Sequence, residues 1–188
     1  MLRMLVLLAQ VFIASASLAA QESVFTSLTA DQLEGYQFDQ SDTPFRVTQL
    51  NVGQRTILDS QRRLISDLML RHLGTSRLKG DIADLDHFQA LIQKKAIQKN
   101  DVANWQALGV VFGDFLVAKH GLTWVVYEDE LGASKALRWR DTDNFVFPMT
   151  VFSKRVQFKE IPEPHAIYAD LVKVITAFKA LEARPKLP

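Results

Sequence analysis

Basic and aromatic residues gather in the last third of the sequence at spacings that could bind an anionic group. The candidates share two expected strands and the segment that follows them: Trp124, Asp129, Arg138, Trp139, Arg140, Lys154 and Arg155. Guanidinium groups bind carboxylate or phosphate oxygens through paired hydrogen bonds. One hypothesis is therefore a cationic groove beside a tryptophan, whose partner would be a protein or an anionic component of the cell envelope. The simpler interpretation, which we favour, is charge pairing across neighbouring strands, at about 0.2–1 kcal/mol per pair.

The residue patterns that many enzymes need are absent or scattered. The sequence has no cysteine, which excludes disulfides, thiolate metal sites and a cysteine nucleophile. Its four histidines form no H-E-x-x-H pattern, so a zinc site would have to be assembled from remote segments. There is no G-x-x-x-x-G-K-[ST] loop, no G-x-G-x-x-G turn and no G-x-S-x-G elbow. We therefore expect no cofactor and no metal, and we assign no catalytic residue.

Two short motifs look like functional signatures, and a structural interpretation is favoured for both. Ser76 and Lys79 have the S-x-x-K spacing of penicillin-recognising enzymes, but the S-D-N and K-T-G elements of that fold are missing. Gly109 and Gly113 form a G-x-x-x-G pattern, which in a long apolar span would favour membrane dimerisation. Because the charged Asp114 follows at once, we expect these glycines to let a helix approach the sheet closely.

The first residues are typical of an export signal. Arg3 precedes an apolar run over 4–14, and small residues then lead up to Ala19 and Ala20. This order predicts a secretory signal peptide over residues 1–19, cleaved after Ala19 or, alternatively, after Ala20. A permanent membrane anchor would need about 20 apolar residues, more than this run supplies. We therefore expect a periplasmic or secreted protein with no membrane span after removal of the leader.

The charges of the mature protein balance. The chain has 22 Lys and Arg residues against 21 Asp and Glu residues, and Arg3 leaves with the leader. A protein that binds nucleic acid or an anionic membrane surface needs an excess of basic residues. We therefore exclude nucleic acid as a partner.

The hydrophobic periodicity predicts an α+β fold. We expect N-terminal helices, then a three-stranded antiparallel meander, then a closing C-terminal helix. The helices are predicted over 56–73, from 84 onward, over 102–119 and over 163–182, and the strands over about 122–128, 135–140 and 144–147. Asp84 belongs to an acidic cluster with Asp81 and Asp86, and it is the expected cap of the second helix. Residues 20–54 are expected to be irregular, 55–183 to form a single domain and 184–188 to form a tail.

The chain resembles an uncharacterised bacterial family, the domain-of-unknown-function family DUF3806, over about residues 82–160. The resemblance rests on ordered short motifs: Asp84-Leu85, Phe88-Gln89, Leu108-Gly109, Gly113, Trp124, Glu128-Asp129, Gly132, Ala136-Leu137-Arg138, Phe147-Pro148, Thr150 and Ser153-Lys154-Arg155. It implies a small α+β domain, exported in some members. It implies no reaction.

The sequence favours a non-enzymatic binding or accessory module outside the cytoplasm. The alternative is a small hydrolase that acts on a cell-envelope substrate. That alternative requires one of His87, His120 or His165 to meet a carboxylate and a nucleophile in a cleft.

Overall fold

The computed structural model describes residues 44–182, and the environments of their side chains as far as residue 180. The predicted leader, most of the expected irregular segment 20–54 and the tail 184–188 lie outside this range. Within it, no helix is both long and apolar enough to cross a membrane.

The described residues form a mixed α+β domain, which confirms the predicted fold class. The elements follow one another in this order: β1 (Arg46–Gln49), α2 (Val52–Leu73), α3 (Asp84–Gln93), α4 (Val102–His120), β2 (Thr123–Asp129), β3 (Gly132–Arg138), β4 (Phe145–Val146), the 3-10 turn η1 (Pro148–Thr150), α5 (Val151–Gln157) and α6 (Pro164–Glu182). Strands β2, β3 and β4 are the expected meander. Strand β1 is an addition, because it lies in the segment expected to be irregular.

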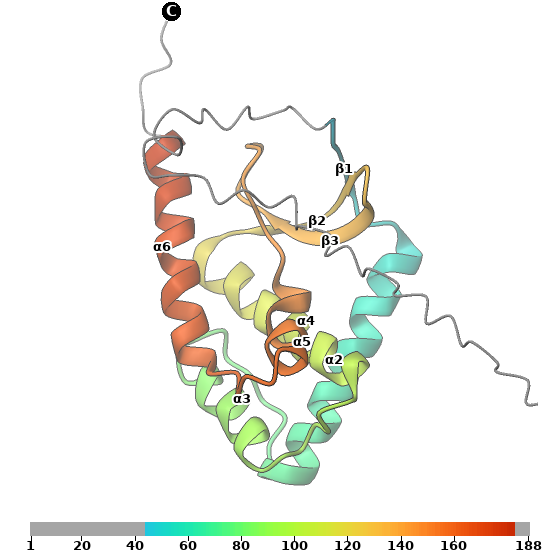
Figure 1. Cartoon of the computed structure of the whole chain (residues 1–188), viewed down its shortest axis with the longest axis vertical. Coiled ribbons are helices and arrows are strands. Elements are labelled where there is room, and N and C mark those ends of the chain that lie inside the picture. Colours follow the sequence, from blue (N-terminus) through green and yellow to red (C-terminus); the bar gives the residue numbers. More distant parts are fainter. Residues whose placement is uncertain (1–43, 183–188) are drawn as a thin grey trace, which may run out of the picture. The chain divides into compact units, whose positions relative to one another are not determined.

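The sheet has the order β1-β2-β3-β4 and all its strand pairs are antiparallel. Its register places Trp124 opposite Leu137 and Thr123 opposite Arg138. Because side chains alternate between the two faces of a strand, Trp124 and Leu137 share the face that packs on the helices. In the view of Figure 1, α4 lies below the sheet and between α6 and α2.

Helix α4 is the centre of the hydrophobic core. Asp101 caps its N-terminus by accepting a hydrogen bond from the amide of Asn104, and Gly121 ends it in the left-handed conformation. Buried residues lie all around the middle of the helix, from Trp105 to Leu116. A helix that is apolar on every side needs neighbours on every side, and α2, α5 and η1 all contact α4.

The glycines of α4 allow two close approaches. A Cβ atom on Gly109 would lie 2.5 Å from the carbonyl oxygen of Pro148 and 2.6 Å from that of Met149. A Cβ atom on Gly113 would lie 2.4 Å from the indole ring of Trp124. The predicted packing role of the G-x-x-x-G pattern is therefore confirmed: one glycine faces the sheet and the other faces η1.

Candidate functional site

A pocket of about 430 Å³ opens between α2, α4 and the connection from α2 to α3. Its apolar walls come from both helices and the connection: Ile65, Leu78, Val111, Phe115 and Ala118. Its remaining lining residues are polar, charged or glycine: Arg62, Ser66, Ser76, Lys79, Gly80, Asp84 and Asp114. Mostly apolar walls with a few fixed polar groups are typical of small-molecule sites.

The carboxylate of Asp84 holds the connection in place as one wall of the pocket. Asp84 is only 1% exposed. It accepts hydrogen bonds from the backbone amide of Lys79 at 2.9 and 3.1 Å and from that of Gly80 at 2.7 Å. The prediction that Asp84 caps α3 is wrong: Ala83 is the capping residue and makes no side-chain cap. The carboxylate binds the preceding connection instead, because those amides have no partner in regular secondary structure.

Gly80 brings the connection against α4. Its φ is +72°, in the left-handed region that glycine adopts without steric cost. A Cβ atom at this position would lie 2.9 Å from the Cβ of Ala118. The backbone of the connection therefore passes as close to α4 as a side chain normally would.

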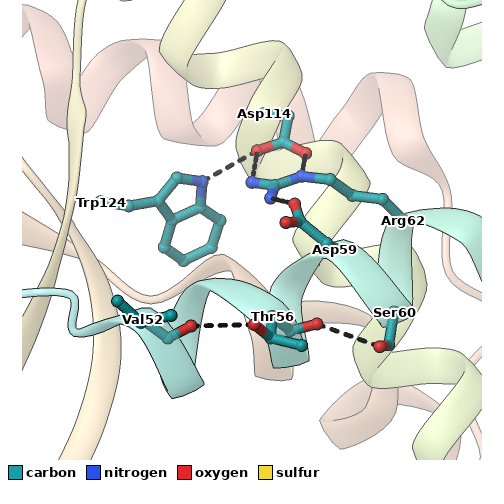
Figure 2. Close-up of polar contacts among 7 residues, drawn as sticks. All are labelled: Val52, Thr56, Asp59, Ser60, Arg62, Asp114 and Trp124. Atoms are coloured by element: carbon teal, nitrogen blue, oxygen red, sulfur yellow. Dashed lines mark hydrogen bonds and ion pairs between the residues drawn. The ribbon is translucent and has the colours of Figure 1, made fainter.

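An ion-pair network forms the polar wall (Figure 2). The Arg62 guanidinium donates to both carboxylate oxygens of Asp114 at 2.7 Å and to Asp59 at 2.7 Å. The indole Nε1 of Trp124 donates to Asp114 at 2.9 Å. The hydrogen bond to Asp114 contributes most to raising the pKa of Arg62 above its ordinary value, against the opposing effect of burial. The network fixes α2, α4 and β2 to one another beside the pocket.

The hydroxyls on the outer part of α2 are used within the helix. Thr56 donates to the carbonyl of Val52 and Ser60 donates to that of Thr56, both at 3.0 Å (Figure 2). In contrast, the hydroxyls of Ser66 and Ser76, which line the pocket, make no hydrogen bond with the described residues. These two hydroxyl groups are therefore available to donate hydrogen bonds to a ligand in the pocket.

The residues of the predicted cationic groove do not gather at one place. The sheet register puts Trp124 and Arg138 on opposite faces. Arg138 is engaged by the turn that follows it: its Nε donates to the carbonyl of Thr142 at 2.7 Å, and it pairs with Asp141 and Asp143 at 3.8 and 3.6 Å. This pairing neutralises Arg138 within the turn after its own strand, and not across neighbouring strands as the simpler interpretation expected.

Of the other predicted residues, Trp139 and Arg140 are in contact with each other. Trp139 is 6% exposed, and two cations lie near its ring, with the Arg140 guanidinium 4.9 Å and the Lys179 ammonium 5.1 Å from the ring centre. Arg155 donates to the carbonyl of Val151, and Asp129 accepts from the amide of Leu131 in the hairpin turn. Lys154 is exposed on α5. None of the predicted site residues lines the pocket.

The histidines named by the hydrolase hypothesis also lie outside the pocket lining. His165 pairs with Asp86 at 2.8 Å, and both side chains are largely exposed. His87 and His120 each bury a ring nitrogen that finds no hydrogen-bond partner in the described part of the chain. The pKa of His120 is lowered mainly by burial, and the neighbouring charges of Lys179 and Lys119 lower it further.

Comparisons with known proteins support the fold and leave the chemistry open. Residues 84–168 match the family model described as "Domain of unknown function (DUF3806)", which confirms the resemblance found in the sequence. A crystal structure of a protein from Bacteroides thetaiotaomicron VPI-5482 is similar, with a TM-score of 0.60 and 15% identity. The similarity covers 68% of this chain and 47% of that one, so it spans about half the length of the solved protein. No curated protein matches.

Proposed function

With residues 84–168 matched to the DUF3806 family, we propose that the protein is an exported, non-enzymatic binding module that holds a small molecule between α2, α4 and the connection from α2 to α3. The observation that carries this proposal is the pocket of about 430 Å³ with its fixed polar wall. Known small-molecule pockets enclose roughly 300–1,000 Å³.

The surroundings of the pocket favour binding over a reaction. A general base needs a carboxylate or imidazole within hydrogen-bond reach of the substrate. Asp114 is held by Arg62 and Trp124, and Asp84 is held by backbone amides. Among the described residues that line the pocket there is no histidine. These contacts support a module that orients a ligand without transforming it.

The predicted leader supports a place of action outside the cytoplasm. A charged start, an apolar run and small residues before Ala20 are the features that the export machinery recognises. A protein without cysteine meets no redox constraint in an oxidising compartment. The ligand would then be a molecule of the periplasm or of the cell's surroundings.

A substitution that fills the pocket with a bulky side chain tests the proposal. A library of fluorinated fragments, neutral, anionic and cationic, is screened by ligand-observed ¹⁹F NMR against the wild type and two variants. Ser66→Phe places a ring in the pocket, whereas Ser60→Phe places the same ring on the exposed part of α2, away from the lining residues. We expect binders that are retained by Ser60→Phe and lost in Ser66→Phe.

Two results would overturn the proposal. One is a complete absence of binders to the wild type. The other is binding that Ser66→Phe leaves unchanged while circular dichroism shows that the variant is folded.

A further inference from the structure

We infer that the pocket selects a ligand with an anionic head and an apolar body. The inference rests on the proposed function, because it assumes that the pocket is occupied. It concerns the class of ligand and is argued from which polar groups of the lining are already engaged and which are not.

Both carboxylates of the lining are engaged by the protein. Asp114 accepts three hydrogen bonds, two from Arg62 and one from Trp124. Asp84 accepts its hydrogen bonds from the backbone of Lys79 and Gly80 and is almost fully buried. A ligand cation would have to share Asp114 with Arg62 and Trp124, because Asp84 is buried against backbone amides. A cationic ligand is therefore disfavoured.

The donors of the lining, in contrast, are available. Within residues 44–182 the Lys79 ammonium makes no ion pair or hydrogen bond, and neither do the hydroxyls of Ser66 and Ser76. Lysine carries three donors on a flexible stem and no acceptor. Arg62 has five N–H groups, of which three are used by Asp59 and Asp114. A carboxylate or similar anion is the ligand group that satisfies such donors.

The formal charge of the lining is zero, with Arg62 and Lys79 against Asp84 and Asp114, so the case for an anion depends on which of these charges are already engaged. Arg62 is neutralised by the carboxylate of Asp114, with which it forms a two-bond pair. The negative charge of Asp84 is spread over the amides that bind it. Lys79 is exposed on the connection and has no such partner among the described residues. Its charge is the one that a ligand anion can pair with.

The apolar walls favour a ligand whose body is a hydrocarbon group. Ile65, Val111 and Phe115 are buried core residues that also line the pocket. They expose little surface themselves, and the more exposed Leu78 and Ala118 supply apolar surface whose contact with a hydrocarbon group is favourable. A water molecule takes about 30 Å³ in the liquid, so 430 Å³ accommodates a ligand of roughly a dozen non-hydrogen atoms.

Three matched compounds test the head group. We would measure binding of 4-phenylbutanoate, 4-phenylbutanol and 4-phenylbutylamine by isothermal titration calorimetry at low salt. The three share one hydrocarbon body and differ in the charge of the head. We expect the carboxylate to bind about tenfold more tightly than the alcohol, as one charge-assisted hydrogen bond implies, and the amine to bind most weakly.

One lysine variant and one arginine variant test whether the preference for the carboxylate depends on Lys79. Lys79→Gln should remove the preference for the carboxylate and leave the affinity for the alcohol nearly unchanged. Arg77→Gln removes a positive charge from the same connection at a residue that does not line the pocket, and it should retain the preference. Equal effects of the two variants would contradict the inference, because they would indicate a general charge effect.

The outcomes separate this inference from the proposed function. An alcohol or amine that binds as tightly as the carboxylate overturns the anionic head and leaves pocket binding intact. Failure of all three compounds overturns the ligand class, and the fragment screen with Ser66→Phe then decides whether the pocket binds anything.

Discussion

Asp114 is the residue at which three parts of the fold meet. It lies on α4, accepts two hydrogen bonds from Arg62 of α2 and accepts one from Trp124 of β2. Its side chain is 33% exposed and that of Arg62 is 35% exposed, so the pair is partly shielded from water. Charge-assisted bidentate pairs of this kind are stronger than ordinary surface ion pairs. The partly buried position makes the pair a structural contact as well as a wall of the pocket.

Replacement of Asp114 should therefore destabilise the domain. Asp114→Asn removes the charge and leaves Arg62 without its main partner, which should lower the free energy of unfolding by about 1–3 kcal/mol. Asp59→Asn is the control, because Asp59 also binds Arg62 but is more exposed, and its loss should cost at most about 1 kcal/mol. Urea denaturation followed by circular dichroism measures both. Equal costs would mean that Asp114 is no more than a surface partner.

His120 should make stability depend on pH. Its ring lies 5.7 Å from that of Tyr168 on α6, and burial together with Lys179 and Lys119 lowers its pKa. A lowered pKa means that the unfolded chain binds the proton more readily than the folded protein. Stability should then be greatest above about pH 6.5, where the residue is neutral in both states, and should fall as the pH drops below that value.

A histidine replacement measures this contribution. We expect His120→Gln to lose less unfolding free energy than the wild type between about pH 7.5 and pH 5.5. His72→Gln removes an exposed histidine from the last turn of α2 and serves as the matched control. If His120→Gln follows the wild-type curve, the imidazole does not resist protonation in the folded state.

At the scale of the elements, α4 is held by two contacts that only glycine permits. Gly109 faces backbone atoms of η1, and Gly113 faces the ring of Trp124. Backbone cannot move aside as readily as a side chain. A larger residue should therefore be tolerated less well at Gly109 than at Gly113. The sheet and η1 consequently pack directly against the backbone of α4.

We expect Gly109→Ala to cost about 1–3 kcal/mol of stability, because its Cβ would overlap two carbonyl oxygens. The matched control is Gly53→Ala in the first turn of α2. There the new Cβ would lie 3.5 Å from the Asn51 side chain, an ordinary contact, and the higher helix propensity of alanine should stabilise by up to about 1 kcal/mol. Thermal unfolding of both variants tests the difference, and a neutral Gly109→Ala would show that η1 can shift.

Local patterns in the sequence predict most of the elements. The helices at 56–73 and 102–119 follow from apolar residues at helical spacing and from the glycines after them, and the structure has α2 and α4 there. Strand β1 could not be predicted in the same way, because its four residues are mostly exposed and show no apolar alternation. Its strand conformation comes from pairing with β2, a contact remote in sequence.

The candidate site was harder to predict than the fold. The predicted cationic groove included both Trp124 and Arg138, but their side chains lie on opposite faces of the sheet. The pocket draws its lining from α2, α4 and the connection before α3, and no motif joins these segments in the sequence. Ser76 and Lys79 did stand out as a motif, although the chemistry that their spacing suggested is unrelated to the pocket wall they form.

At the scale of the whole molecule, the balanced charge bears on which partners the surface attracts. With 22 basic and 21 acidic residues, the surface offers no general attraction for polyanions. Selectivity then has to come from local arrangements such as Lys79 at the pocket. The protein would then combine a surface without net charge with a pocket that prefers an anionic ligand.

The predicted leader can be tested directly. Expression of the full chain in a bacterium with a periplasm should give a mature protein that begins at Ala20 or Gln21, as shown by N-terminal sequencing and intact mass. It should be recovered by osmotic shock. Arg3→Glu should slow processing, since the positive charge at the start of a signal favours its insertion. An uncleaved protein in the cytosolic fraction would exclude the proposed compartment.

The edge strand β1 imposes an order on folding. Arg46 pairs with Glu128, 82 positions later, whereas β2 and β3 are neighbours in a tight hairpin. Contacts between remote segments carry a larger loop-closure entropy than local ones. A ribosome that has made only the first hundred residues has therefore produced an edge strand with nothing to pair with. Until the hairpin emerges, the backbone groups of that stretch lack their partners in β2, and an unpaired strand edge is prone to pair with other chains.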